Sequence, residues 1–435
     1  MTSGGERLIV FTRYPEPGRT KTRLIPALGP EGAADLHRRM TEHTLARARA
    51  LAERRGTSLE VRFEGGGQAL MAQWLGTRLA SRPQGEGDLG DRMARAIADA
   101  LREGAARAIV IGTDCPALAS ATLAAAFDAL QHNDLVLGPA TDGGYYLIGL
   151  RREAPALFAD MPWGTGDVLK RTLAAAKAAG LSFALLGPLD DVDRPEDLPL
   201  WERAQWRISV IIPTLNEAAA LPATLAAIQP EADVEVIVAD GGSSDGTTEA
   251  ALAAGARLVA AERGKARQMN AGAAAASGDV LLFLHADTRL PQGFDAHVRD
   301  ALGRPGAVAG AFAFRVDSPR RGLRVIEWLA NWRSRRLGMP YGDQGIFVKA
   351  DAFREAGGYP DLPVMEDFEL MRRLKRRGRI VLARAAAVTS GRRWLRLGLL
   401  RTTLVNQAMI VGYLLGVSPE RLARWYRGGT RVSAL

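Results

Sequence analysis

Two runs of β-branched and apolar residues, each followed by a turn of small and polar residues, constrain the fold of this chain most strongly. The first run and its turn read ISVIIPTLNE (Ile208 to Glu217), and the second read VEVIVADGGSSDGT (Val234 to Thr247). Continuous apolar runs of this length are typical of parallel strands buried on both faces, with Pro213 ending the first strand. Ligands of open α/β sheets bind outside the carboxyl ends of such strands. Asp240 lies at the tip of the second strand before two glycines, so we expect it to contact the ribose or base of a nucleotide.

Both halves of the 435-residue chain alternate short apolar runs with helical periodicity, which predicts an α/β fold with mainly parallel sheets covered by helices. The pattern restarts between Arg203 and Arg207, so the expected domains are residues 1–203 and 207–435, without a long flexible linker between them. Strands are expected at residues 8–11, 59–63, 108–112, 135–138, 182–186, 208–213, 234–240, 256–260 and 280–284. Helices are expected at residues 31–54, 89–102, 119–131, 168–179 and toward the C-terminus.

The net charge of +9 is concentrated at the end of the chain, where fifteen lysines and arginines follow Glu369 and only Glu420 is acidic. Such a terminus fits a nucleotide diphosphate, an anionic membrane surface or nucleic acid, and solvated helix faces explain it equally well. No recognised nucleic-acid-binding module accompanies it, so we expect no nucleic-acid partner. The single cysteine, Cys115, and the lack of a signal-peptide pattern or a long apolar run predict a cytoplasmic protein. Peripheral contact of the basic terminus with the inner face of the cell membrane is a further expectation.

Loops after predicted strands of the first half carry charged residues suited to a phosphorylated ligand. Lys21 and Arg23 follow the glycine turn of PEPGRTKTRL, which fits a phosphate cradle or a basic surface loop equally well because the P-loop spacing is absent. Asp88 precedes a helix start in QGEGDLGDRM, a shape that accepts a base or a phosphate. Asp114 and Asp193 end two further strands, and their carboxylates suit one Mg²⁺, although each alone is also a common cap or turn residue.

Asp142 lies before two glycines and two tyrosines and is a candidate for the substrate side of the same site. Across residues 7–200 the segments PGRTKTRL, GDLGDRM, GTDCPAL, GPATDGGYYLIGL, PWGT and DVDRPEDL stand in this order. They resemble a family of GT-A-like, DUF2064-type transferases associated with radical-SAM genes, and also nucleotidyltransferases such as the 2-phospholactate guanylyltransferases. The resemblance implies that the basic loop holds phosphates and that Asp114 and Asp193 hold a divalent cation.

The second half carries four further segments, in the order ERGKARQMNAG, LLFLHADTR, YGDQGIF and VMED. Lys265 and Asn270 lie in the first, in a basic loop and in the helix after it, which by itself is also an ordinary alanine-rich helix with a basic flank. The second segment is an aliphatic strand that ends in the tripeptide HAD, whose Asp287 is a hard ligand for Mg²⁺ or Mn²⁺. Glu366 and Asp367 open a helix in the fourth, where acidic residues are common because of the helix dipole.

Together with the two opening strands, this order resembles a family 2 glycosyltransferase, an inverting enzyme of the GT-A fold. The resemblance implies a nucleotide-sugar donor held by Pro213, Asn216, Glu217, Asp240, Lys265 and Asn270. It also implies a divalent cation at Asp287, acceptor contacts from Asp343 and Gln344, and Asp367 as the catalytic base beside Glu366. His285 replaces the first aspartate of the family's D-x-D motif, which leaves the identity of the metal open between Mg²⁺, Mn²⁺ and a softer ion.

The segment SGRRWLRL resembles the R-W element that follows the base in this family. It implies that Arg392, Arg393 and Trp394 clamp the diphosphate or the acceptor, although the glutamine of the usual Q-x-x-R-W form is absent. The sequence therefore predicts two GT-A domains in tandem and a glycosyltransferase that moves a sugar to a small-molecule or lipid acceptor, with arsenosugar pathways implied for some relatives. The first domain is expected to be a second glycosyltransferase, a nucleotidyltransferase that supplies the nucleotide sugar, or a non-catalytic binding domain.

Overall fold

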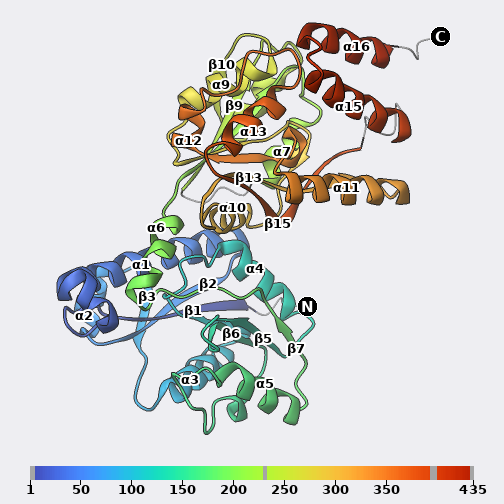
Figure 1. Cartoon of the computed structure of the whole chain (residues 1–435). Helices are drawn as coiled ribbons and strands as arrows, with labels where there is room; N and C mark the ends of the chain where they lie inside the picture. Colours follow the sequence, from blue (N-terminus) through green and yellow to red (C-terminus); the bar gives the residue numbers. More distant parts are fainter. Residues whose placement is uncertain (1–4, 229–232, 392–398, 432–435) are drawn as a thin grey trace. The chain divides into compact units, whose positions relative to one another are not determined.

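The computed structural model describes residues 5–228, 233–391 and 399–431, and the chain divides into two compact units (Figure 1). Unit 1 is Met1–Ala204 and unit 2 is Gln205–Leu435. Each unit contains one sheet with helices around it, as the alternating pattern of apolar runs and helical periodicity predicts.

Unit 1 is built on a seven-stranded sheet in the order β3-β2-β1-β4-β6-β5-β7. All neighbouring strands pair in parallel except β6, which is antiparallel to both β4 and β5. The strands are β1 (Gly5–Arg13), β2 (Ser58–Glu64), β3 (Ala80–Pro83), β4 (Ala105–Ile111), β5 (Leu135–Pro139), β6 (Tyr145–Leu150) and β7 (Phe183–Leu185). The five predicted strands are confirmed, whereas β3 and β6 were not predicted.

The helices of unit 1 include the four that helical periodicity predicts. Its helices are α1 (Ile25–Arg55), α2 (Gly67–Leu75), α3 (Leu89–Arg102), α4 (Ser120–Ala129), α5 (Val168–Ala178) and α6 (Leu198–Ala204), with short 3₁₀ turns η1 (Thr22–Leu24), η2 (Pro155–Leu157) and η3 (Pro195–Asp197). Helix α1 begins before the predicted start because Pro30, in its first turns, is accommodated by a kink at Gly29, whose φ is 72°.

Unit 2 is built on an eight-stranded sheet in the order β10-β9-β8-β11-β14-β13-β15-β12. Strands β8 to β11 are parallel, and β14 is antiparallel to both of its neighbours. The strands are β8 (Ile208–Thr214), β9 (Val234–Asp240), β10 (Arg257–Ala260), β11 (Val280–Phe283), β12 (Thr288–Arg289), β13 (Ala307–Asp317), β14 (Ile346–Lys349) and β15 (Arg379–Ser390). Pro213 does not end the first strand: it lies inside β8 opposite Ala239, and β8 continues to Thr214.

The helices of unit 2 lie between and after these strands. They are α7 (Leu221–Ala227), α8 (Thr247–Ala253), α9 (Lys265–Ala275), α10 (Phe294–Leu302), α11 (Arg321–Leu337), α12 (Ala350–Glu355), α13 (Glu366–Lys375), α15 (Leu399–Leu414) and α16 (Pro419–Arg431), with the 3₁₀ turn η4 (Gly342–Gln344). Among the described helices, none combines the length and the apolar character needed to cross a membrane.

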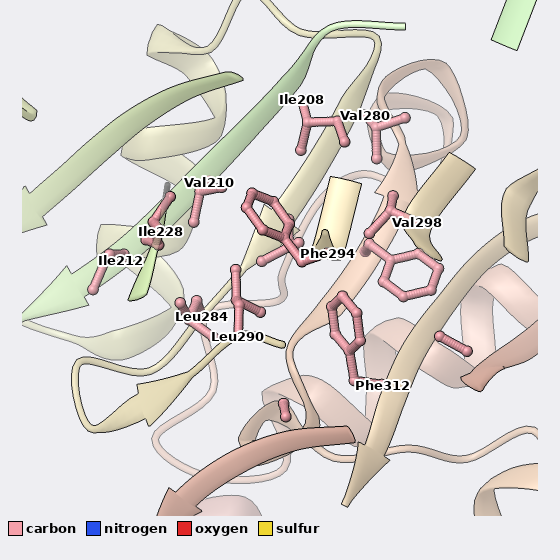
Figure 2. Packing of buried hydrophobic residues seen from close by; sticks show 14 of the residues in the cluster. Ile208, Val210, Ile212, Ile228, Val280, Leu284, Leu290, Phe294, Val298 and Phe312 are labelled. Atoms are coloured by element: carbon pink, nitrogen blue, oxygen red, sulfur yellow. The ribbon is translucent and has the colours of Figure 1, made fainter. Parts of the chain in front are cut away.

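Alternating side chains of the central strands of unit 2 enter two different hydrophobic clusters. Ile208, Val210 and Ile212 of β8 pack with Phe294 and Phe312 in the first cluster (Figure 2). Ile211, between them in the sequence, belongs to the second cluster. Because successive side chains of a strand point to opposite faces, the sheet has a core on each side, and its loops at the carboxyl edge are held on a rigid base.

Candidate functional site

A cavity of about 480 Å³ in unit 2 collects residues from all four predicted segments of the second half. Lys265 enters it from the first turn of α9, Asp287 from the loop after β11, and Glu366 and Asp367 from the first turn of α13. Lys265 and Asp287 follow β10 and β11, which run in the same direction and end at the same edge of the sheet. The strand before Glu366, β14, is antiparallel to β11, and α12 with the loop after it leads the chain back to this edge. The structure therefore brings together the predicted base, its acidic neighbour and the predicted metal ligand.

The ammonium of Lys265 lies between the two carboxylates at the start of α13. Its Nζ is 2.9 Å from Oδ2 of Asp367 and 3.0 Å from Oε1 of Glu366. Burial alone would lower the pKa of Lys265, but Asp367 and Glu366 raise it above its ordinary value. Lys265 is therefore charged at physiological pH and holds both carboxylates in one orientation.

The two oxygens of Asp367 have different surroundings. Oδ2 accepts hydrogen bonds from Lys265 and, at 3.1 Å, from the backbone N–H of Gly342. Oδ1 is buried and has no hydrogen-bond partner among the described residues. A buried carboxylate oxygen normally accepts hydrogen bonds, so Oδ1 is positioned to accept one from a bound ligand.

Two backbone features fix the position of Asp367. A Cβ atom at residue 342 would lie 2.4 Å from Oδ2 of Asp367 and 2.8 Å from Nε2 of His285, so the close approach requires the glycine that is present there. Met365, immediately before the helix, has φ 70°, a left-handed conformation that is unfavourable for a residue with a side chain. Strained backbone of this kind is found where the position of functional side chains is fixed by the fold.

His285 lies in the same cavity with its Nε2 atom buried and without a partner among the described residues. Burial, and then the positive charge of Lys265, lower the pKa of His285 to about 3. The imidazole is therefore neutral at physiological pH and can donate or accept one hydrogen bond at Nε2. Asp343 and Tyr341 also line this cavity, and the buried hydroxyl of Tyr341 has no partner among the described residues.

Asp240 and Asn216 organise the loops at the ends of β8 and β9. Asp240 accepts hydrogen bonds from Thr214 Oγ1 and from the backbone N–H groups of Gly242 and Ser243. Burial would raise the pKa of Asp240, but these hydrogen bonds hold it below its ordinary value. Asn216 has φ 56°, and its side chain accepts from the N–H of Ser244. Asp240 and Asn216 therefore shape the loops after β8 and β9, and contact with a nucleotide sugar stays a prediction for both.

Three other predicted residues make structural hydrogen bonds. Asn270 binds both the N–H and the carbonyl oxygen of Tyr359, at 3.0 and 2.8 Å. Gln344 is buried, and its amide bonds to Phe312, Ser334 and Tyr341 rather than opening into the acceptor region. In unit 1, Asp88 caps α3 reciprocally with Asp91. These contacts correspond to the ordinary structural roles of such residues.

A cavity of about 540 Å³ in unit 1 is lined by three of the predicted residues, Asp114, Asp142 and Asp193. Nζ of Lys21 lies 2.7 Å from Oδ1 of Asp114, 2.9 Å from Oδ1 of Asp193 and 2.5 Å from the carbonyl oxygen of Val192. Arg23 contacts the second oxygen of Asp193 at 3.1 Å. The structure thus brings the two predicted metal ligands together, with the lysine ammonium between them.

The electrostatics of this cluster favour its charged form. Burial would lower the pKa of Lys21, but Asp114 and Asp193 raise it, and burial would raise the pKa of Asp114, but Lys21 holds it below its ordinary value. Lys21 itself has φ 48°, a left-handed backbone that directs its side chain toward the carboxylates. All three N–H bonds of the ammonium are used, so a phosphate meets Lys21 only after one of these contacts is broken.

The sequence did not reveal several residues of the unit 1 cavity. Asp142 lines it as predicted, with its side chain accepting from the N–H of Gly144. Tyr145 and Trp163 line the wall with rings in edge-to-face contact, and neither the Tyr145 hydroxyl nor the Trp163 N–H has a partner among the described residues. The adjacent Tyr-Tyr and the PWGT segment were visible in the sequence, but nothing there shows that the two meet. Arg392, Arg393 and Trp394 lie outside the described residues.

Each unit matches a different protein-family model. Residues 209–354 match the model of glycosyl transferase family 2. Residues 44–165 match a model described as an uncharacterized protein conserved in bacteria (DUF2064). The predicted pairing of a DUF2064-type domain with a family 2 domain is thereby confirmed, whereas the association with radical-SAM genes and the arsenosugar pathway stay predictions.

Individual relatives cover parts of the chain. A glucosyl-3-phosphoglycerate synthase of Mycobacterium tuberculosis is 35% identical over 133 residues, which make up 24% of this chain and 41% of the relative, so the chain spans about two fifths of its length. A structure from Desulfovibrio desulfuricans G20, described as a candidate nucleotide-diphospho-sugar transferase, is 34% identical over 46% of this chain and 87% of its own chain, with a TM-score of 0.43. A mannosyltransferase from Pyrobaculum calidifontis, solved with GDP-Man and Mn²⁺, is 23% identical over 51% and 68%, with a TM-score of 0.38. The predicted fold class is confirmed in that each of the two units is an α/β domain with a mainly parallel sheet flanked by helices.

Proposed function

Because the chain belongs to one family with the Desulfovibrio protein described as a candidate nucleotide-diphospho-sugar transferase, we propose that it is a glycosyltransferase whose unit 2 carries the transfer site. In this proposal a sugar moves from a nucleotide-sugar donor to an acceptor hydroxyl with inversion. The observation that carries it is Asp367, which lines the cavity with its buried Oδ1 unpartnered among the described residues while Lys265 holds Oδ2.

The geometry suits general base catalysis by Asp367. An acceptor hydroxyl that donates to Oδ1 transfers its proton there as its oxygen forms a bond to the anomeric carbon of the donor. The bond from that carbon to the diphosphate breaks on the opposite face, so the configuration inverts and the nucleoside diphosphate leaves with the electron pair. Lys265 and the Gly342 N–H keep Asp367 oriented, and the neutral His285 beside them offers a hydrogen bond to the ligand.

Asp287 is the residue that would hold a divalent cation in unit 2. No group of three or more histidine, cysteine or acidic side chains in the described ranges could enclose a metal ion. A single carboxylate, that of Asp287, still fits Mg²⁺ or Mn²⁺. These ions need only one or two protein carboxylates when the phosphate oxygens of the substrate complete the coordination shell. When bound, the cation supplies positive charge to the leaving diphosphate. The mannosyltransferase of Pyrobaculum calidifontis was solved with Mn²⁺.

The donor and the acceptor enter from different sides in this proposal. The donor lies against the loops of Pro213, Asn216, Glu217 and Asp240, which Asp240 holds in place. The acceptor, a small molecule or a lipid, lies beside Asp343. The cytoplasmic location stays a prediction.

Unit 1 is proposed to bind a second phosphorylated ligand in its own cavity. In this proposal Lys21 and Arg23 turn to the phosphates when the ligand binds, and Asp114 and Asp193 then hold a cation in the place of the Lys21 ammonium. The clustering of these four side chains supports this proposal. A second glycosyltransferase, a nucleotidyltransferase that makes the nucleotide sugar, and a binding domain without catalysis are the three alternatives. They differ in what unit 1 turns over: a nucleotide sugar, a nucleoside triphosphate with a sugar phosphate, or neither.

Donor binding to the full chain tests the proposal for unit 2. UDP-glucose, UDP-GlcNAc and GDP-mannose are titrated calorimetrically with Mn²⁺ into the wild type and into the variants Asp287→Ala and Asp367→Asn. We expect one of these donors to bind, Asp287→Ala to weaken it at least about tenfold and Asp367→Asn to leave it unchanged, because the base contacts the acceptor. Binding that does not respond to Asp287→Ala would contradict the proposal.

A further inference from the structure

The inner face of helix α11 in unit 2 packs on strand β13. Leu323, Ile326 and Ala330 pack against Phe314 and Val316 of β13. Two polar residues of the same face bond to the backbone of β13: Glu327 accepts from the N–H of Val316, and Asn331 bonds to both backbone groups of Phe314. The position and rotation of α11 on the sheet are therefore fixed.

The outer face of α11 is apolar as well, although it is exposed. Val325, Trp328, Leu329 and Trp332 are 59%, 64%, 47% and 49% exposed. Their spacing of three, one and three residues places them in one stripe along the helix. Two exposed tryptophans and two exposed aliphatic residues in one stripe exceed what scattered surface apolar residues explain, and such patches mark interaction sites.

The charges around this stripe are almost all positive. Residues 315–340 contain seven arginines and two acidic residues. Both acids are already paired, Glu327 with Arg324 and Asp317 with Arg289. Arg335 and Arg336 are exposed at the end of the same helix.

The helices next to α11 also combine exposed apolar side chains with an excess of arginines. Helix α11 contacts α15. Helix α15 in turn contacts α16, beside which it lies in Figure 1. Most of the exposed large apolar side chains in the described part of unit 2 lie on these three helices, including Leu404, Val411 and Leu414 of α15 and Trp425 of α16. Leu415, directly after α15, is exposed as well. In residues 399–431, five arginines accompany a single acidic residue.

We propose that the outer face of α11 docks on an anionic lipid surface. Tryptophan and aliphatic side chains enter the boundary between headgroups and acyl chains, while the flanking arginines meet the anionic headgroups. A second copy of the chain fits this face poorly, because a two-fold contact through the stripe would bring its arginines against the same arginines. The inference does not depend on which reaction unit 2 catalyses.

Vesicle binding of the full chain tests this inference. The protein is sedimented with vesicles of phosphatidylcholine alone and of phosphatidylcholine with 30% phosphatidylglycerol, a composition chosen as roughly that of an anionic membrane. We expect binding to the anionic vesicles, weaker binding at high salt and little binding to the neutral vesicles. The double variant Trp328→Ser/Trp332→Ser is expected to bind the anionic vesicles at least about tenfold more weakly. The matched control is Leu252→Ser on α8, a side chain that is 60% exposed elsewhere on unit 2.

Several results overturn the inference. These are equal binding to neutral and anionic vesicles, no binding to either, or unchanged binding of the tryptophan variant. A concentration-dependent dimer in light scattering that the tryptophan variant abolishes would show instead that a second copy covers this face. Thermal unfolding checks that each variant is folded, and donor binding measured in parallel separates a failure of this inference from a failure of the proposed function.

Discussion

Nζ of Lys265 lies 2.9 Å from Oδ2 of Asp367, and this ion pair leaves the other, buried oxygen of the carboxylate without a partner among the described residues. Unit 1 contains a related arrangement, in which the ammonium of Lys21 joins Asp114 and Asp193. In both units a buried or half-buried lysine orients two carboxylates at the carboxyl edge of a sheet. In unit 2 it leaves an acceptor oxygen available, whereas in unit 1 it occupies the space between the two carboxylates.

Replacement of Asp367 by asparagine removes the proposed base while keeping its size. We expect Asp367→Asn to lower kcat by about 10²- to 10⁴-fold with little change in donor affinity, because general base catalysis contributes on this scale. Release of the nucleoside diphosphate measures turnover with the donor that binds. Asp361→Asn is the matched control, since Asp361 forms an exposed ion pair with Arg267 on the same unit. Equal losses in the two variants would argue against a catalytic role.

A methyl group at residue 342 is expected to displace the base. In Gly342→Ala the added Cβ would lie 2.4 Å from Oδ2 of Asp367, so the carboxylate or the turn must move. We expect turnover to fall at least about tenfold, because small displacements of catalytic groups are costly, while the protein stays folded. Gly187→Ala is the control, because a Cβ there meets no atom within 4 Å. Normal turnover of Gly342→Ala would show that Asp367 need not hold this position.

Lys21 is expected to exclude a free divalent cation from unit 1. In an Asp287→Ala background, which removes the proposed cation ligand of unit 2, the added substitution Lys21→Met leaves Asp114 and Asp193 without their ammonium. We expect this double variant to bind Mn²⁺ and to unfold at a higher temperature when Mn²⁺ is added, whereas the Asp287→Ala parent does neither. Electron paramagnetic resonance of free Mn²⁺ measures the binding.

The control for this experiment is Lys170→Met, which removes an exposed lysine of α5. Mn²⁺ binding by the Lys170 variant, or its absence from the Lys21 variant, would contradict the prediction.

Burial of His37 predicts a loss of stability in mild acid. Its Nε2 contacts Thr12 Oγ1 and the carbonyl oxygen of Arg13, and burial lowers its pKa below the ordinary value of 6.5. As the pH falls below about 6.5, His37 becomes protonated in the unfolded chain but stays neutral in the folded chain. The free energy of unfolding therefore falls by about 1.4 kcal/mol per pH unit, until the pH reaches the pKa of His37 in the folded chain.

Denaturant unfolding at pH 7 and pH 5.5 measures this effect. We expect His37→Gln to lose less stability between these two values than the wild type, whereas His132→Gln, at an exposed position, behaves as the wild type does. A wild type and a His37 variant with the same pH dependence would show that another group is responsible.

The sequence predicted those strands whose side chains have strong β propensity. Runs such as ISVIIP and VEVIVAD identify β8 and β9, and the fold class followed from them. Strands β13 and β15 were not predicted because their sequences, AVAGAFAFRVD and RIVLARAAAVTS, are rich in alanine, which has no preference for strands. They form strands because they pair with each other and with the strands on either side: β13 also pairs with β14, and β15 also pairs with β12.

The candidate sites were predicted as groups of residues without their contacts. Asp367 and Lys265 were each selected for a motif, but 102 residues separate them, and only the folded sheet brings them together. Conversely, Asn270 and Gln344 matched motifs, while their amides donate to backbone carbonyl oxygens, of Tyr359 and of Phe312 in β13 respectively. Side-chain partners depend on tertiary packing, which sequence patterns do not encode locally.

Because the backbone of Met365 is left-handed, selection for stability and selection for activity are expected to favour different residues at this position. A glycine there would relieve a strain of about 1 kcal/mol or more, so a search for heat-resistant variants is expected to favour it. The same glycine would loosen the turn that aims Glu366 and Asp367 at the ligand. Heat tolerance gained at this position is therefore expected to come with slower turnover, and a laboratory lineage selected only for survival at high temperature would drift away from catalysis here first.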